Sequence, residues 1–508
     1  MIIDYFNTLI YENFGFTPTP EQSQVIKKLT QFILSVDDNG QRVDNSSMPS
    51  IFVLRGYAGT GKTSLIGALV RTIKQLKRQC VLLAPTGRAA KVFSLYSEHP
   101  AYTIHKRIYR QKSIDLDSPF SLDYNSMKHT LFIVDEASMI STGNGQSNGN
   151  IMYNRSLLDD LVEFVYSREG CRLILLGDTA QLPPVGEYES PALQSATFNS
   201  MGFNVTCATL TQVVRQREQS GILENATNIR TLINSDDIFE HQHLLQENLM
   251  PKIMFTKDVT NIPGNELIET ISHCYHEYGT DDTIVICRSN KRVNVYNNGI
   301  RREILDRESE LSNNDMIMIA KNNYFWLRNE APQLEQTEDK DESDETVNTT
   351  APFLANGDIA KVVRVRNERE LYGFRFADVE LILPDYNDME IEATVLLDTL
   401  HSESPSLTYE QNEKLFNNIM EDYMDIPYKR DRLKKMKEDP YYNALQIKYA
   451  YAVTCHKAQG GQWSQVFIDQ GYISDDMIGI DYYRWLYTAF TRATDHVYLV
   501  NWKQDEDD

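Results

Sequence analysis

The chain has 508 residues, of which 41% are hydrophobic, and its formal net charge is −22. At roughly 150 residues per domain, this length predicts two to four domains rather than a single hydrophobic core. No run approaches the roughly 18 apolar residues that a membrane helix needs, and the first residues lack a basic and apolar leader. We therefore expect a cytoplasmic protein that makes no membrane contact.

The six cysteines are scattered and lack the paired spacing of a zinc site or a disulfide framework. Cys455 lies beside His456, but no further ligands follow at metal spacing. We expect reduced thiols and no zinc site.

Much of the negative charge is local. Eight acidic residues and one lysine lie between Glu330 and Glu345 and give this segment a charge of −7. Such runs are usually solvated, and a binding groove needs only local basic or hydrogen-bonding groups. The acidity therefore weakens the case for a nucleic-acid partner without excluding one.

The first structural signal along the chain is Thr19-Pro20-Glu21-Gln22, which predicts a helix start. Thr19 suits the N-cap, Pro20 the first helical position and Gln22 the third, where a glutamine can complete a capping box.

The next signal is a phosphate-binding loop. An apolar run of strand type at 51–54 precedes it, and apolar residues at helical spacing over 64–76 follow it. In such a loop backbone N–H groups surround the phosphates, the lysine reaches the β/γ oxygens and the threonine hydroxyl ligates Mg²⁺. The residues are Gly56, Ala58, Gly59, Thr60, Gly61, Lys62 and Thr63, and they predict a nucleoside triphosphatase.

Acidic residues follow a second apolar run. The strand predicted at 131–134 ends in Asp135 and Glu136. At the carboxyl end of a parallel strand beside the first, Asp135 can hold the Mg²⁺ water shell and Glu136 can polarise the attacking water. A strand running into a polar turn is the alternative.

A third apolar run at 172–176 ends in the loop 177–184, where Gln181 can contact the γ-phosphate or orient the water. Strands at 51–54, 81–84, 131–134 and 173–176 alternate with helical segments, which predicts a parallel sheet with ligands at its carboxyl edge. The alternation resumes at 283–287, 465–469 and 496–500 and predicts a second sheet. The segment 485–493 reads as a helix that carries Arg492.

In these residues the chain resembles the superfamily 1 helicases, and within them the RecD-like, Dda-type branch, superfamily 1B. The resemblance covers nearly the whole length and rests on seven motifs in the expected order. They are Gly56–Thr63, Ala84–Ala90, Asp135–Ser138, Gly177–Pro184, Thr211–Gln216, Thr454–Gly460 and Tyr487–Ala493.

The resemblance implies an α/β fold with two RecA-like P-loop domains. Residues 1–205 would form the first, and residues 206–310 and 450–508 the second. A β-hairpin at about 107–128 would be the pin that splits the duplex, with Phe120 as its candidate wedge. Residues 311–449 would form an inserted SH3-like β-barrel with a helical extension.

The resemblance also implies site residues. ATP would bind between the two domains, with Arg215 and Arg492 as arginine fingers; surface ion pairs are the alternative for both arginines. Gln22 would recognise adenine, and Gly460 would lie at the nucleotide. The implied DNA contacts are Pro85, Thr86, His105, Asn290, Thr454, His456 and Lys457; for His105 a surface histidine after a capping threonine explains the pattern as well.

The function implied is an ATP-dependent 5′-to-3′ DNA helicase that uses Mg²⁺ and works as a monomer on single-stranded DNA and at single-strand/duplex junctions. Replication or repair proteins are the expected partners, although nothing in the sequence selects a pathway. Three alternatives stay open: an RNA helicase of the same superfamily, the motor subunit of a nuclease or repair complex, and a catalytically silent scaffold.

Overall fold

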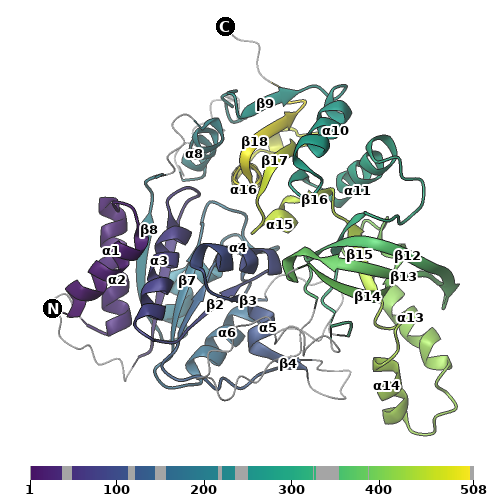
Figure 1. Ribbon diagram of the computed structural model, residues 1–508, viewed down its shortest axis with the longest axis horizontal. Helices are drawn as coiled ribbons and strands as arrows, with labels where there is room; N and C mark the ends of the chain where they lie inside the picture. Colours follow the sequence, from purple (N-terminus) through teal and green to yellow (C-terminus); the bar gives the residue numbers. More distant parts are fainter. Residues whose placement is uncertain are drawn as a thin grey trace. The chain divides into compact units, whose positions relative to one another are not determined.

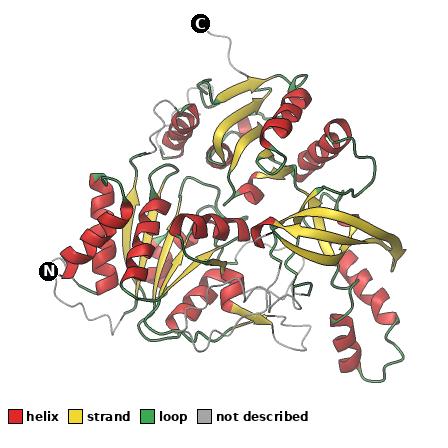
Figure 2. Cartoon of the chain, in the orientation of Figure 1, coloured by secondary structure: helices red, strands yellow, loops and turns green. Residues whose placement is uncertain are grey.

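The computed structural model describes residues 2–36, 48–111, 120–143, 156–214, 220–234, 250–323, 325–327, 354–386 and 388–503 (Figures 1 and 2). Contacts divide these residues into a first unit, residues 2–214, and a second unit, residues 220–503. None of the described helices has the length and apolar character needed to cross a lipid bilayer.

The first unit is built on a six-stranded parallel sheet with the order β3-β2-β6-β7-β1-β8. The strands are β1 (Ser50–Gly56), β2 (Cys80–Ala84), β3 (Ala101–Thr103), β6 (Leu131–Val134), β7 (Arg172–Gly177) and β8 (Asn204–Leu210). The helices are α1 (Ile2–Phe14), α2 (Pro20–Leu34), α3 (Lys62–Gln75), α4 (Gly87–Ser97), α5 (Ile104–Ile108), α6 (Leu157–Tyr166) and α7 (Ser195–Ser200), with 3-10 turns at Ala137–Met139 and Pro191–Leu193.

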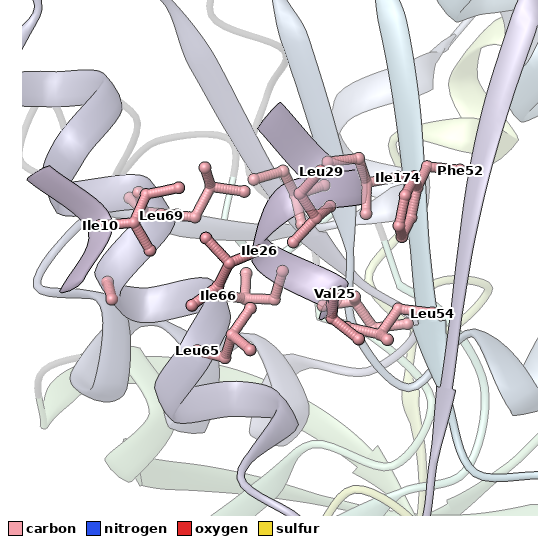
Figure 3. Packing of buried hydrophobic residues seen from close by; sticks show 14 of the residues in the cluster. Ile10, Val25, Ile26, Leu29, Phe52, Leu54, Leu65, Ile66, Leu69 and Ile174 are labelled. Atoms are coloured by element: carbon pink, nitrogen blue, oxygen red, sulfur yellow. The ribbon is translucent and has the colours of Figure 1, made fainter. Parts of the chain in front are cut away.

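Both faces of this sheet are covered by apolar side chains. Because side chains alternate along a strand, Phe52 and Leu54 of β1 face α2 and α3 (Figure 3), while Ile51 and Val53 pack on the other face with residues of α5 and α6. All four are fully buried. The phosphate-binding loop therefore joins a strand and a helix that are both fixed by the core.

The second unit contains a five-stranded sheet with the order β16-β10-β17-β18-β9, again parallel. Its strands are β9 (Val259–Ile262), β10 (Thr283–Cys287), β16 (Ala452–Thr454), β17 (Trp463–Asp469) and β18 (Ala493–Val500). Its helices are α8 (Gly221–Ile233), α10 (Leu267–Tyr278), α11 (Asn290–Gly299), α15 (Cys455–Ala458) and α16 (Ile480–Phe490), and α11 continues into a π-helical turn at Ile300–Ile304.

A closed five-stranded barrel is inserted into the second unit between α11 and β16. It consists of β11 (Met316–Ile319), β12 (Ile359–Leu371), β13 (Phe374–Leu383), β14 (Met389–Leu396) and β15 (Leu445–Tyr449), and it carries α13 (Tyr409–Glu421) and α14 (Lys429–Lys437) between its last two strands. Two parallel sheets and an inserted barrel confirm the predicted fold class.

Four details differ from the sequence predictions. The predicted boundary at residue 205 falls inside β8, which pairs with β1 as far as Leu210, so the first sheet extends further. β6 is not beside β1, because β7 lies between them. The helix predicted over 485–493 ends at Phe490, and the charged segment 409–437 forms two helices, the first ending at Glu421 and the second beginning at Lys429.

At the predicted hairpin, β4 (Tyr109–Gln111) and β5 (Phe120–Leu122) pair antiparallel. The turn between them lies outside the described residues, as does the acidic run 330–345.

A buried charge network joins the barrel to the second sheet. The Asp315 carboxylate, fully buried, accepts hydrogen bonds from Arg301 Nε and Nη2, both at 3.0 Å, and from Arg307 Nη1 at 2.5 Å. The Tyr451 hydroxyl, from the turn before β16, also donates to Asp315 Oδ1, at 2.9 Å. The carboxylate thereby neutralises two arginines and fixes the start of β11.

We expect Asp315→Asn to destabilise the second unit by about 3–5 kcal/mol, because it leaves buried guanidinium groups without a counter-charge. Denaturant unfolding with hydrogen exchange at β11 and β15 measures this loss. Asp398→Asn is the matched control: Asp398 pairs with Arg375 at a partly exposed site and should contribute within ~1 kcal/mol. Equal effects of the two substitutions would contradict a structural role for the network.

Candidate functional site

The carboxyl edge of the first sheet gathers the predicted nucleotide-binding residues. Because the strands are parallel, the segments that follow β1, β2, β6 and β7 all leave at this edge. They are the phosphate-binding loop, Pro85-Thr86, Asp135-Glu136 and the loop that begins at Gly177. Ligands of open α/β sheets bind at such an edge.

The phosphate-binding loop has the backbone that its glycines permit. Gly59 and Gly61 have φ angles of +76° and +80°, in the left-handed region that favours glycine. At Gly61 a Cβ would also lie 2.8 Å from Gln22 Nε2. The loop conformation and the close packing of α2 therefore both require glycine here.

Lys62 is the first residue of α3 and folds back over the loop. Its ammonium donates hydrogen bonds to the carbonyls of Gly56 and Tyr57, the second at 2.9 Å. The positive charge is thus held within the loop, with only neutral carbonyl oxygens as its hydrogen-bond partners among the described residues. Phosphate oxygens would replace these carbonyls with anionic acceptors, which form stronger bonds with an ammonium.

Asp135 and Glu136 form a closely coupled pair. The Asp135 carboxylate accepts a hydrogen bond from the Glu136 backbone N–H at 2.9 Å, and Glu136 adopts a left-handed backbone with φ +51°. Burial, and then the Glu136 charge, raise the pKa of Asp135 to about 7, while the Lys62 charge lowers it. Lys62 therefore lies close enough to act on Asp135, and a divalent cation would favour the ionised carboxylate in the same way.

The loop after β7 holds a polar atom that has no partner. Gln181 is 5% exposed, and its Oε1 is buried without a hydrogen bond among the described residues. The Ser138 hydroxyl after Glu136 is likewise buried and unpaired. Since a buried acceptor without a partner costs roughly 1–3 kcal/mol, such atoms in a native fold indicate a site for water or a ligand.

Gly177 brings the loops after β6 and β7 together. A Cβ on Gly177 would lie 3.0 Å from the Ser138 backbone nitrogen and 2.8 Å from Leu193 Cδ1. Only glycine lets these segments meet so closely. Among the described residues, no three His, Cys, Asp or Glu side chains gather as a metal site. The donor set fits Mg²⁺ with a nucleoside triphosphate, since Mg²⁺ typically uses one or two carboxylates, waters and phosphate oxygens.

Gln22 forms the predicted capping box and also contacts the phosphate-binding loop. Its Oε1 accepts from the Thr19 backbone N–H at 3.0 Å, and its Nε2 donates to the Thr60 carbonyl at 3.1 Å. The side chain is 1% exposed. The cap is confirmed, and Gln22 links the start of α2 to the loop; adenine recognition stays a prediction.

The DNA contacts predicted in the first unit lie near β2 and β3. Thr86 caps α4, accepting a hydrogen bond from the Ala89 N–H at 3.2 Å, and Pro85 precedes it at the end of β2. His105 lies on α5 with its ring 5.6 Å from that of Tyr109. Burial lowers the pKa of His105 to about 4, so at neutral pH this side chain can stack or hydrogen-bond but carries no charge.

The contacts predicted in the second unit lie together at a sheet edge. Strands β10 and β16 are neighbours that pair Cys287 with Thr454, so Asn290 and Thr454 follow at the same edge. His456 and Lys457 lie on α15, and burial lowers the pKa of both side chains.

Sequence reasoning missed Lys448 on β15. Burial, and then the Lys457 charge, lower the pKa of Lys448 to about 8. The Lys448 ammonium donates a hydrogen bond to the Ser402 carbonyl, and the Lys457 charge acts on it from α15. The alternation of polar and apolar residues along β15 did not indicate this interaction, because the proximity of Lys448 to Lys457 depends on how the barrel folds.

Arg492 lies in the turn between α16 and β18 and is 4% exposed. Its guanidinium donates to the Thr488 carbonyl at 3.1 Å, the Gly461 carbonyl at 3.2 Å and the Thr491 hydroxyl at 3.1 Å. Gly460, with φ +74°, lies next to this group. Across the described parts of the chain no carboxylate pairs with Arg492, which is buried, and its role as an arginine finger stays a prediction.

The side chains of two predicted site residues are not among those that the structure describes. Arg215 lies outside the described residues. Phe120 begins β5, and only its backbone belongs to the described structure. The cysteines that were predicted to be reduced are free thiols, and burial raises the pKa of Cys455 to about 12.

Comparison with known proteins agrees with this arrangement. The AAA domain family matches residues 45–237, and the UvrD-like helicase C-terminal domain matches residues 449–500. The ATP-dependent RecD2 DNA helicase of Deinococcus radiodurans is 28% identical over 193 residues, which cover 37% of this chain and 23% of that protein. The ATP-dependent DNA helicase dda of Enterobacteria phage T4 is 29% identical over 182 residues, which cover 35% of this chain and 37% of that protein. The chain is a superfamily 1B helicase.

Other relatives of this superfamily 1B chain extend over more of its length. An uncharacterized protein of Acanthamoeba polyphaga mimivirus is 22% identical and covers 94% of this chain and 98% of its own length. Among solved structures, the Pif1 helicase from Bacteroides in complex with ADP-AlF3 and ssDNA is 15% identical, with a TM-score of 0.42 over 96% of this chain and 92% of that one. The two family matches, with the similarity to the RecD2 and dda helicases, confirm the family predicted from the motifs.

Proposed function

We propose that the chain hydrolyses ATP to move 5′ to 3′ along single-stranded DNA and to open the duplex ahead of it. The observation that carries this proposal is the set of groups at the carboxyl edge of the first sheet. Among the described residues, three groups belong to this edge: an ammonium that is bonded only to carbonyls, the half-buried Asp135 carboxylate on which that ammonium acts, and a glutamine oxygen without a hydrogen bond. Membership in superfamily 1B supports the coupling of this site to DNA.

The chain's own residues would divide the chemistry. Lys62 and the loop N–H groups would bind the β- and γ-phosphates, and Thr63 with Asp135 would hold Mg²⁺. Bound Mg²⁺ neutralises charge on the phosphate oxygens. Glu136 would accept a proton from the attacking water, and Gln181 Oε1 would orient that water. Arg492 would neutralise charge that develops on the transferred group, which agrees with a buried guanidinium that has no carboxylate partner among the described residues.

DNA would be held mainly by its backbone. Pro85 and Thr86 in the first unit, and Asn290, Thr454 and Lys457 in the second, lie at strand ends or helix starts where backbone N–H groups and short polar side chains reach phosphates. Contacts of this kind position a strand without reading its sequence. Binding should therefore weaken steeply with salt and show little sequence preference.

An unwinding assay tests the proposal. The substrates are duplexes that carry either a 5′ or a 3′ single-stranded tail, as DNA and as RNA, with ATP and Mg²⁺. We expect opening of the 5′-tailed DNA duplex only, and none by Lys62→Ala. Opening of the 3′-tailed duplex would overturn the polarity, preference for RNA would favour the RNA helicase, and the absence of ATP turnover would favour the scaffold.

Gln181→Leu separates a catalytic role of Gln181 from a structural one. Leucine has a similar volume and removes an oxygen that has no partner, so the free energy of unfolding should stay the same or rise. We expect ATP turnover to fall by roughly 10²-fold, in the range for the loss of one polar group at a reacting centre. Gln24→Leu, on the exposed face of α2, is the control for the substitution itself. Unchanged turnover in Gln181→Leu would exclude Gln181 from the reaction.

A further inference from the structure

Helix α14 carries a concentration of positive charge that the proposed function does not use. Six of its nine residues are lysine or arginine and one is aspartate, which gives a net charge of +5 in a chain of net charge −22. The neighbouring helix α13 carries three glutamates and one lysine. The cations of the barrel's helical extension are therefore concentrated on α14.

Not all of these cations stabilise the helix that carries them: Lys434, Lys435 and Lys437 lie in the last turn, where the helix dipole favours positive charge, but the first turn carries cations as well. Lys429 and Arg430 occupy the first turn, where the helix dipole disfavours positive charge, and Tyr428 provides no side-chain cap. Arg430 and Lys434 are four residues apart, and Lys434 and Lys437 are three residues apart, so these like charges face one another. Each such pair destabilises the helix by about 0.2–0.5 kcal/mol. The cations of the first turn and the like-charge pairs therefore do not serve the helix locally, as is typical of a functional surface.

The cations are also available for a partner. Lys429, Arg430 and Lys434 are exposed, and no carboxylate pairs with them among the described residues. Lys435 makes one loose ion pair with Glu438, at 3.9 Å, in which both side chains are more than half exposed. Tyr428, 72% exposed, extends the surface at the start of the helix.

The helix is firmly held from the opposite side. Met436, 1% exposed, packs in a cluster with Leu415 and Ile419 of α13 and the barrel residue Phe376. Beyond the helix, Asp439 accepts a hydrogen bond from the Tyr423 hydroxyl at 2.7 Å, and Asn443 Nδ2 donates to the Lys437 carbonyl at 2.9 Å. The structure therefore presents the cations from a fixed support.

We propose that α14 binds the phosphate backbone of double-stranded DNA next to the strand on which the protein moves. This inference rests on the proposed function. Arg430, Lys434 and Lys437 recur at helical spacing and extend over about 10 Å at ~1.5 Å per residue, so they can face several phosphates. Of the single-strand contacts proposed above, those in the second unit lie on α11, β16 and α15, whereas α14 lies on the far side of the barrel from α11 and α15 (Figure 1). DNA that reaches α14 is thus outside the single-strand path.

The test compares binding of two DNA probes without nucleotide: a single strand, and a duplex with a 5′ tail of the same single strand. The variant is Arg430→Gln, Lys434→Gln and Lys437→Gln together, because glutamine has a similar helix propensity. The control variant is Lys74→Gln, Lys77→Gln and Arg78→Gln together. It neutralises three exposed cations of the first unit, which lie at and just after the end of α3 that is opposite to the phosphate-binding loop.

We expect the variant to bind the tailed duplex on the order of tenfold more weakly at moderate salt. The slope of the logarithm of the affinity against the logarithm of the salt concentration should become shallower by about 0.9 for each phosphate contact removed. Affinity for the single strand and DNA-stimulated ATP turnover should not change, and the control should match the wild type on both probes. Circular dichroism should show an intact fold, since like-charge pairs have been removed.

Other outcomes overturn the proposal in different ways. Unchanged affinity for both probes would mean that α14 serves another acidic partner, such as a protein. An equal loss on both probes would place α14 on the single-strand path. If the wild type binds neither probe, the proposed function fails together with this inference, whereas failure of the inference alone leaves single-strand binding and turnover intact.

Discussion

Glu136→Gln should abolish most ATP turnover while nucleotide binding stays at least as tight as in the wild type. The amide cannot accept a proton from the attacking water, and loss of a general base typically costs about 10²–10⁴-fold. Steady-state turnover and equilibrium binding of a labelled nucleotide in the presence of Mg²⁺ measure the two effects separately.

The sign of the binding effect follows from the coupling between the two carboxylates. The Glu136 charge raises the pKa of Asp135, so its removal lowers that pKa and leaves more Asp135 ionised near neutral pH. An ionised Asp135 is the better ligand for Mg²⁺. Binding should therefore hold or improve, most visibly below pH 7.

Asp135→Asn is the matched comparison, because it also replaces one carboxylate by an amide of similar size. It should raise the Mg²⁺ concentration that half-maximal turnover requires, and it should weaken binding of the nucleotide with Mg²⁺. If Glu136→Gln weakens binding as much as Asp135→Asn does, the assignment of base and metal ligand to different residues is wrong.

The positions of these residues along the chain could be predicted, because each follows an apolar run that ends abruptly. A buried strand needs continuous apolar residues, and the polar residues after it must reach solvent or a ligand. This pattern located the strands that became β1, β6 and β7 within a few residues. It also located β10 without error.

The order of the strands could not be predicted in the same way. β7 lies between β1 and β6, so Asp135 is two strands away from the phosphate-binding loop. Local patterns specify which face of a strand is buried but not which strands pair, since this depends on long-range packing. At about 4.8 Å between neighbouring strands, the separation leaves room for a hydrated Mg²⁺ between Asp135 and the loop.

Local side-chain partners such as the Thr19–Gln22 capping box could be predicted, but partners that depend on the fold could not. Gln181 was chosen because of its place in a motif, but its unpaired oxygen is a property of the folded loop. The helix that was expected to carry Arg492 ends at Phe490, since Ala493 already pairs with Trp463 at the start of β18. The close approach of Lys448 to Lys457 arises only because the barrel returns the chain beside α15.

Lys62→Met should remove ATP turnover and unwinding while the fold and single-strand DNA binding persist. Methionine keeps an unbranched apolar stem of similar reach but provides no charge, and the loss of one donor at a phosphoryl-transfer centre typically costs at least about 10²–10³-fold. The free energy of unfolding should stay the same or rise, because Lys62 places a cation at the start of α3, where the helix dipole disfavours it.

Lys74→Met is the internal control, since Lys74 lies exposed in the last turn of the same helix. This substitution should leave turnover, unwinding and DNA binding unchanged. Thermal unfolding, single-strand binding and turnover, measured on both variants, separate the possible causes. A Lys62→Met variant that still hydrolyses ATP at the wild-type rate would contradict the proposed site. A variant that loses DNA binding and stability together would show that Lys62 supports the fold, through its bonds to the Gly56 and Tyr57 carbonyls, and does not act in the reaction.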